Sequence, residues 1–431
     1  ANINTLRYTG AAGTIAGALT STGIMNVSGN ALTFSGAITG GSGGMVINAA
    51  NGSIAFTSSV NNGGNMLIFD GAGATSIGNT VLTGAGGLTK SGSGTLSLNY
   101  GSGNNPTYGG PTILNGGILR LGGGGSGNNL SGLPTGNITV NGGVFDVYWG
   151  NTFQRALGNG TNQIQITGGV SGFSQIANGQ TLAIKFGNTN TPIIWGSDYF
   201  KPTVLVLNSV NGFGTVDFQN YVNFDGGSRT VEVNAGGSTM SGVLSNSSGT
   251  AGLIKTGAGT LVLSTGTANT YNGGTSINQG TLRFATKVSM PATGAVTVND
   301  GGNLGVNLGT AGTVWSNGTS GVGTIGGLLA GDGGQAASQI TYIGNVGLNL
   351  EVAANVTYSG DMANVGTSLR LIKTGGSSLT LSGNNSYSGG TTLAAGALIV
   401  ATNTAIPSTG TIRLNGGTIQ SNDATARSFT N

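Results

Sequence analysis

Residues 87–98 have the sequence Gly-Leu-Thr-Lys-Ser-Gly-Ser-Gly-Thr-Leu-Ser-Leu, and residues 252–263 repeat it closely as Gly-Leu-Ile-Lys-Thr-Gly-Ala-Gly-Thr-Leu-Val-Leu. A third version occupies residues 371–381, where Lys373 again stands six residues before the first leucine of an alternating segment. In all three copies two leucines stand two residues apart, with a polar residue between them in the first and third copies. This spacing is typical of a half-buried β-strand. The chain therefore contains a repeated strand–turn–strand unit.

Each copy continues in the same way. A tyrosine beside a Gly-Gly pair follows at Tyr108, Tyr271 and Tyr387, and then a glycine precedes another apolar strand. Gly-Gly, Asn-Gly and Ser-Gly pairs indicate turns between the strands, and helical spacing of apolar residues is nearly absent. A recurring unit of this kind favours a stack of parallel turns over a two-layer sandwich, because each unit needs a neighbour to cover its apolar face.

We therefore predict an all-β fold, a single-stranded parallel β-helix (β-solenoid) in the form of an elongated rod. At about 20 residues per turn the chain would make about 21 turns. At ~4.8 Å per turn, such a rod would be on the order of 100 Å long.

The composition limits the function. The chain has 87 glycines among 431 residues, only 14 basic and 11 acidic residues, and no histidine or cysteine. This excludes His/Cys metal sites, Ser-His-Asp and Cys-His nucleophiles, and disulfides. The net charge of +3 comes without a Lys/Arg cluster, so nucleic-acid binding is not expected. Few charges suit a stacked fold, because like charges repel in a column whereas Asn, Thr and Ser can form hydrogen-bonded ladders.

The repeated motif resembles the autotransporter-associated β-strand repeat, also called the passenger-associated transport repeat. The match covers Gly87–Leu121, Gly252–Ala285 and Leu369–Thr402, and weaker copies lie at Ala31–Ile47, Arg229–Ser247 and Pro407–Asn431. The resemblance implies a right-handed parallel β-helix from a secreted or surface-exposed bacterial protein. One departure is Ser377, which replaces the second glycine of the Gly-x-Gly turn in the third copy.

We divide the chain into a solenoid part at residues 1–144, an aromatic-rich widened or inserted section at 145–226, and a second solenoid part at 227–431. No apolar run approaches the ~18 residues that would span a membrane. Ala1 would suit the residue just after a removed signal peptide. The predicted location is therefore extracellular or on the bacterial surface.

Neither end of the chain looks like the atypical repeat that usually caps a solenoid. The residues that would form exposed ends are Ile3, Leu6, Tyr8, Arg427, Phe429 and Asn431. One hypothesis is that subunits stack head to tail through these ends into a homopolymer. The alternative is that the sequence is a piece of a longer chain.

Thirteen of the 26 aromatic residues lie within residues 145–224. Exposed aromatic faces stack on sugars or bind partners, so we name a candidate glycan or partner surface. Its residues are Tyr148, Trp149, Trp195, Tyr199 and Tyr221. The alternative interpretation, which we favour, is a wider turn with a larger apolar core.

Catalytic and cofactor sites are not expected. Asp217 and Asp225 are the nearest approach to a catalytic carboxylate pair, and Gly331–Gly334 is a lone turn rather than a calcium-binding repeat. The glycine-rich segment 122–127 is not followed by a helix that could bind phosphate. We predict no enzyme activity, no cofactor and no metal. The recurrent lysines Lys90, Lys255 and Lys373 could form a binding stripe, but we expect a solvated rim that discourages lateral aggregation.

The predicted function is structural: a rigid subunit of a secreted or cell-surface filament. The first alternative is an adhesin passenger that binds glycan or surfaces through residues 145–226. The second alternative is an enzyme that acts on polysaccharides.

Overall fold

A computed structural model describes residues 1–78, 81–100, 106–123, 133–148, 152–187, 189–197 and 199–423. The chain divides into two compact units, Ala1–Asn220 and Tyr221–Asn431. This division falls inside the section that was delimited from the sequence at residues 145–226, and the boundaries at 144 and 226 remain predictions.

The fold is the predicted β-solenoid. Strands make up 47% of the structure and helices 2%, and the parallel strands stack into about 17 turns. The number of turns is smaller than predicted because most turns are longer than 20 residues. Leu348 pairs with Leu371, 23 positions later, whereas Phe173 pairs with Leu207, 34 positions later.

The first unit contains 23 described strands. These are β1 (Asn2–Tyr8), β2 (Gly13–Ile15), β3 (Leu19–Asn26), β4 (Leu32–Phe34), β5 (Ile38–Gly40), β6 (Met45–Ala49), β7 (Ile54–Phe56), β8 (Val60–Asn61), β9 (Leu67–Asp70), β10 (Thr75–Gly78), β11 (Leu82–Thr83), β12 (Leu88–Lys90), β13 (Thr95–Tyr100), β14 (Thr112–Leu114), β15 (Ile118–Gly123), β16 (Ile138–Val147), β17 (Thr152–Gln154), β18 (Ala156–Leu157), β19 (Gln163–Gln175), β20 (Thr181–Lys185), β21 (Ile193–Ile194), β22 (Val204–Leu207) and β23 (Thr215–Phe218).

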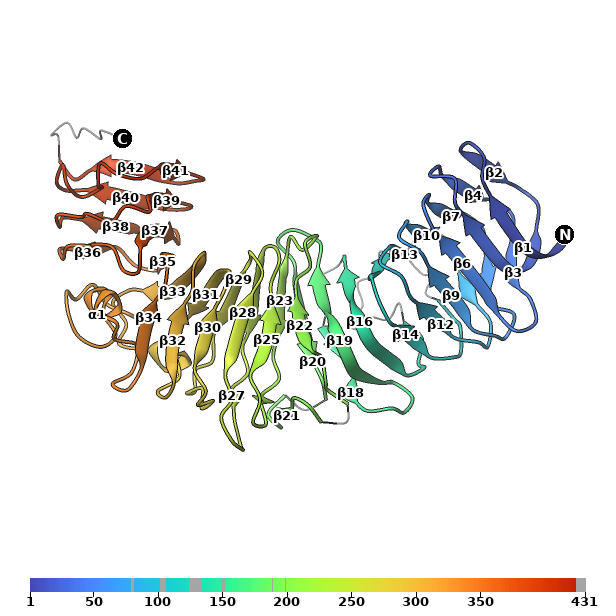
Figure 1. The fold of residues 1–431 in the computed structure, drawn as a ribbon, viewed down its shortest axis with the longest axis horizontal. Helices are drawn as coiled ribbons and strands as arrows, with labels where there is room; N and C mark the ends of the chain where they lie inside the picture. The colour runs from blue at the N-terminus through green and yellow to red at the C-terminus, as the bar shows by residue number, and fades with distance from the viewer. Residues whose placement is uncertain are drawn as a thin grey trace. The chain divides into compact units, whose positions relative to one another are not determined.

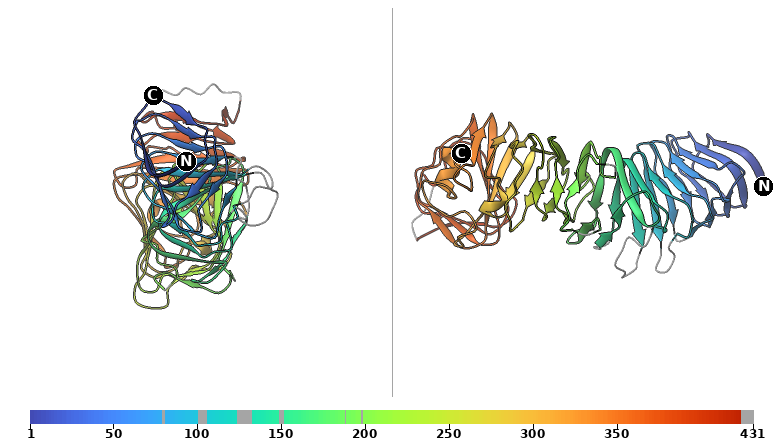
Figure 2. Two further views of the ribbon diagram at one scale, coloured as in Figure 1. Left: turned by 90° about the vertical axis from the view of Figure 1, so that its right-hand side faces the viewer. Right: turned by 90° about the horizontal axis from the view of Figure 1, so that it is seen from below.

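Residues in register form columns along this unit. The strands β2, β4, β7, β10 and β13 lie side by side in Figure 1, each paired in parallel with the next. In the view from below in Figure 2, the blue strands of this unit lie next to one another in a row. Alternate side chains point inward, so a core column runs through Leu32, Ile54, Thr75, Leu96 and Leu119, all at most 3% exposed. Burial of such columns supplies the main driving force for folding.

Aromatic rings fill the wider turns of the first unit. Phe173 lies in the same column as Phe145, with ring centroids 5.8 Å apart, and its ring lies 5.3 Å from that of Phe153. Further ring contacts at 5.8–6.1 Å link Phe186 to Phe200 and Phe218. These six side chains are at most 4% exposed. The longer turns therefore enclose these six rings in the core.

The second unit contains the remaining described elements. These are β24 (Val222–Asn223), β25 (Arg229–Glu232), β26 (Gly237–Met240), β27 (Leu244–Ser245), β28 (Leu253–Thr256), β29 (Thr260–Leu263), β30 (Thr275–Ile277), β31 (Gly280–Phe284), the 3-10 helix η1 (Lys287–Ser289), β32 (Ala295–Val298), β33 (Gly302–Leu308), α1 (Ile325–Ala330), β34 (Gln339–Tyr342), β35 (Asn345–Val352), β36 (Val356–Tyr358), β37 (Ser368–Thr374), β38 (Ser378–Leu381), β39 (Thr391–Leu393), β40 (Ala397–Val400), β41 (Ile412–Leu414) and β42 (Thr418–Ser421).

Within this unit the third repeat does not lie on the same faces as the second. In the second repeat the lysine-bearing strand β28 belongs to the stack β25–β28–β30–β32–β34, and the next strand, β29, belongs to a second stack. In the third repeat it is the lysine-bearing strand β37 that continues the second stack, β29–β31–β33–β35–β37. The strand after β37, β38, belongs to a different sheet, β36–β38–β40–β42, which Figure 1 shows as a separate stack. The lysine-bearing strand of the third repeat therefore lies on the next face of the solenoid from that of the second repeat.

Candidate functional site

The three recurrent lysines are buried, and each binds a group of backbone carbonyls. Lys255 is 0% exposed, and its Nζ donates to the carbonyls of Thr256, Gly257 and Gln279 at 2.7, 2.7 and 3.1 Å. The Nζ of Lys373, also 0% exposed, donates to three equivalent carbonyls at 2.7–3.0 Å. Lys90 is 3% exposed and makes the same set of bonds, to Ser91, Gly92 and Gly116. We call each of these groups a lysine clamp.

The clamps show that the predicted solvated rim was wrong. Each lysine stands two residues after a buried leucine, as in Leu88-Thr89-Lys90, and period-two alternation turns both side chains inward. The same alternation could have revealed the burial from the sequence. The chain tolerates a buried ammonium here because three carbonyls from two successive turns replace its water.

Burial changes the ionisation of the clamps. Desolvation lowers the pKa of Lys255 from 10.5 to about 7, and Glu232 only partly opposes it. Desolvation likewise lowers the pKa of Lys90 to about 8 against the opposing effect of Asp70, and it lowers the pKa of Lys373. Above these pKa values the neutral amine still has two N–H donors for the carbonyls.

We predict that the second unit becomes more stable as the pH rises from about 7 to about 9. Between the folded pKa of Lys255 (about 7) and its unfolded value (10.5), the unfolded chain binds more protons, so stability increases with pH. The contribution of Lys255 over this interval is roughly 2 kcal/mol. Urea midpoints at the two pH values should rise in the wild type and rise less in Lys255→Met. An equal rise in both proteins would contradict the assignment to Lys255.

A buried tyrosine accompanies each clamp. The hydroxyl groups of Tyr108, Tyr271 and Tyr387 lie 2.6–2.7 Å from the Oγ1 of the threonine four residues later. Burial raises the pKa of Tyr387 to about 12, and it also raises that of the other two. A polar Thr partner thus lets a large ring occupy the core of every repeat.

The turn of the third repeat keeps its form despite Ser377. The amide of Ser377 donates to the carbonyl of Val352 at 3.4 Å, where Gly259 donates to Val233 at 2.8 Å in the second repeat. The substitution therefore lengthens one hydrogen bond and leaves the clamp of Lys373 intact.

The candidate glycan surface is only partly exposed. Tyr148 is 48% exposed, whereas Tyr199 and Tyr221 are half-buried, and Trp149 lies outside the described residues. Trp195 is 1% exposed, and its Nε1 donates to the carbonyl of Pro202 at 2.8 Å. Trp195 is therefore a core residue and is removed from the candidate surface, because neither face of its indole is open to a sugar.

The structure describes three of the six residues that were named for the chain ends. Ile3 is 38% exposed on β1, and Leu6 and Tyr8 are half-buried. Arg427, Phe429 and Asn431 lie outside the described residues. The β1 strand pairs in parallel with β3, from Asn2 with Thr20 to Tyr8 with Asn26.

The acidic residues considered for catalysis have other partners. Asp217 accepts a hydrogen bond from Gln219 Nε2 at 2.7 Å, and Asp225 accepts one from Ser248 Oγ at 3.1 Å. Asp146 is fully buried against Arg120, with 3.0 Å between its Oδ2 and the arginine Nη2, and burial raises the pKa of Asp146. Within the described ranges, no three Asp or Glu side chains gather closely enough to hold a metal ion. Among the helices described there, none has the length and apolarity to cross a membrane.

The family model of the passenger-associated transport repeat matches residues 88–121, 253–284 and 371–400. Each matched segment begins beside a lysine clamp and contains the tyrosine and the glycine turn that follow it. No match was found among curated proteins or among solved structures. The chain thus carries three copies of the passenger-associated transport repeat.

Proposed function

We propose that this chain is a structural segment of a secreted or cell-surface protein and serves as a stiff β-solenoid spacer. The observation that carries the proposal is the lysine clamp, which recurs in all three matched repeats and joins two successive turns through one buried ammonium. The tyrosine–threonine pairs and the apolar columns add further links between turns. These features stabilise a stack of turns.

The repeat is the basis for the proposed location. Passenger-associated transport repeats are found in exported proteins, and the β-solenoid fits a passenger-like segment. Backbone hydrogen bonds that run from turn to turn make such a segment resistant to stretching and to proteases outside the cell. Fractionation of the source cells, with antibody labelling of intact cells, tests this location directly.

We further propose that subunits assemble head to tail through the free edge of β1. Among the described strands only β3 pairs with β1, and an open strand edge can add another strand. A heterologous contact of this kind builds a filament if it does not close.

We expect Ile3→Lys to shorten any filaments, because a charge on an edge strand disfavours strand addition. The matched control is Ile343→Lys, since Ile343 is 50% exposed and belongs to the second unit rather than to β1. Negative-stain images over a range of protein concentrations measure filament length. Monodisperse particles of the wild type at every concentration would refute assembly and leave the spacer proposal intact.

The proposal includes the absence of catalysis. An enzyme that acts on polysaccharides would release soluble sugars, so incubation of the chain with acidic and neutral polysaccharides should leave reducing-end counts unchanged. Release of product would overturn this part.

A second candidate is adhesion through the first unit. Tyr148 is 48% exposed, and Phe213 is 68% exposed on the loop between β22 and β23. A glycan array with the wild type and Tyr148→Ala tests this candidate, and loss of a wild-type signal in the variant would support it.

A further inference from the structure

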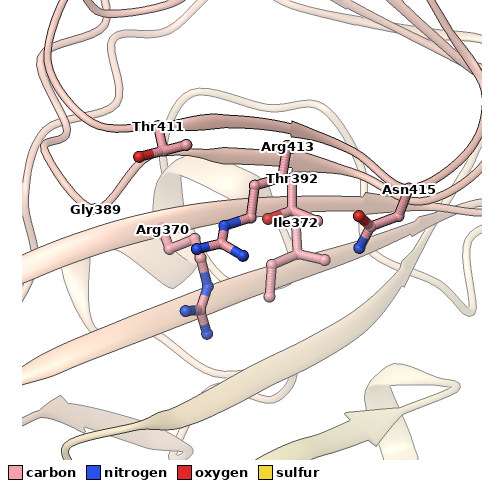
Figure 3. A pocket seen from close by; sticks show the side chains of 7 residues that line it. All are labelled: Arg370, Ile372, Gly389, Thr392, Thr411, Arg413 and Asn415. Carbon is pink, nitrogen blue, oxygen red and sulfur yellow. The ribbon is translucent and has the colours of Figure 1, made fainter.

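The second unit has a hollow of about 340 Å³ on the outer face of the sheet that contains β37, β39 and β41. The register explains its position, because Ile372 pairs with Thr392 and Thr392 pairs with Arg413, so these three residues form one outward column. Arg370 lies two residues before Ile372 on β37. Figure 3 shows the guanidinium groups of Arg370 and Arg413 beside Ile372 in the same hollow.

One of the two arginines is held in place by a buried partner. The Nη2 of Arg370 donates to Asn303 Oδ1 at 2.7 Å. Asn303 is 7% exposed, and its Nδ2 donates to the carbonyl of Gly280 at 2.9 Å. This contact uses one donor of a guanidinium that has five, so most of the donors of Arg370 remain available to a ligand.

The described residues that line the hollow include two arginines and no Asp or Glu. Glu351 lies on the outer face of the same sheet, on β35, and it is paired with Arg283 at 2.6 Å. Among the described residues, no ion pair joins Arg370 or Arg413 to a carboxylate. Two uncompensated guanidinium groups in one hollow repel each other, and an anion between them removes that repulsion.

The remaining polar groups of the hollow suit a sugar. Thr392 and Thr411 contribute hydroxyl groups and Asn415 contributes an amide, so donors and acceptors surround the two cations. Thr411, Arg413 and Asn415 are exposed, so the hollow is open to a polymer that lies along the sheet. Its volume is near the lower end of the ~300–1,000 Å³ of ligand sites.

We propose that this hollow binds an acidic polysaccharide, with a sugar-borne carboxylate or sulfate placed between Arg370 and Arg413. Planar guanidinium groups bind such oxyanions through paired N–H donors. The threonine hydroxyls and the Asn415 amide then contact the sugar hydroxyls. This function goes beyond the spacer role, because a spacer needs no ligand, and it differs from the aromatic surface of the first unit.

The test is binding of the full chain to immobilised polymers at low and moderate salt. The probes are polygalacturonate, which carries carboxylates, dextran sulfate, which carries sulfates, and unmodified dextran. We expect the wild type to bind at least one acidic polymer and to ignore dextran. Arg370→Gln combined with Arg413→Gln should weaken that binding by about tenfold or more, the loss expected for charge-assisted hydrogen bonds.

The control variant carries Lys201→Gln, which removes an exposed positive charge from the first unit outside the β1 strand. It should bind as the wild type does. The proposal fails if Lys201→Gln weakens binding as much as the double variant, because the attraction would then be a general charge effect. It also fails if the wild type binds neither acidic polymer or binds dextran equally. None of these failures affects the spacer proposal, whose test is location and stability.

Discussion

Phe173→Ala should destabilise the first unit by about 3–5 kcal/mol, the usual cost of removing a buried phenylalanine ring. Phe173 is 0% exposed, and its ring contacts those of Phe145, Phe153 and Phe186 at 5.3–6.0 Å. Its removal leaves a cavity in the part of the core where the turns are longest, and adjacent turns restrain collapse. Urea unfolding followed by tryptophan fluorescence measures the effect.

The control for this substitution is Phe213→Ala. Phe213 is 68% exposed, so the same chemical change there should alter stability by no more than about 0.5 kcal/mol. Equal effects of the two substitutions would mean that the aromatic section is not a packed core. Unchanged glycan binding in Phe173→Ala would agree with its place in the interior.

Gly280→Ala should destabilise the second unit by roughly 3 kcal/mol or more, since two costs add. Gly280 has a φ of 65°, which lies in the left-handed region that favours glycine. A Cβ there would also lie 2.4 Å from the carbonyl oxygen of Gly257 and 2.5 Å from that of Gly259. The carbonyl of Gly257 is an acceptor of Lys255, so any backbone shift that relieves the clash disturbs the clamp.

Substitutions at two other glycines of the same unit distinguish the cost of backbone strain from the cost of the steric clash. Gly301 has a φ of 81°, and a Cβ added there would have no atom within 4 Å, so Gly301→Ala should cost only the backbone strain, about 1 kcal/mol. Gly237 has neither a positive φ nor such a contact, and Gly237→Ala should be close to neutral. The urea midpoint should therefore be highest for Gly237→Ala, lower for Gly301→Ala and lowest for Gly280→Ala. A Gly280→Ala variant as stable as Gly237→Ala would contradict the tight turn.

The burial of the three lysines could be predicted from the sequence only in part. A lysine in a strand is usually exposed, and that general expectation predicted a solvated rim. The alternation that begins at Leu253 nevertheless turns Lys255 inward, and only the neighbouring turn supplies the carbonyl of Gln279 that makes this burial tolerable. The alternation was visible in the sequence, whereas the acceptor was not, because it belongs to a residue 24 positions away.

The sequence by itself determined the β-solenoid and its three repeats, because period-two alternation, turn glycines and the repeated motif are all local features. Only the tertiary structure decided which side chains meet across turns of unequal length. It placed Trp195 in the core, moved the third repeat by one face, and brought Arg370 and Arg413 into one hollow. Contacts of this kind depend on the number of residues in each turn, and that number is set by how the chain packs as a whole.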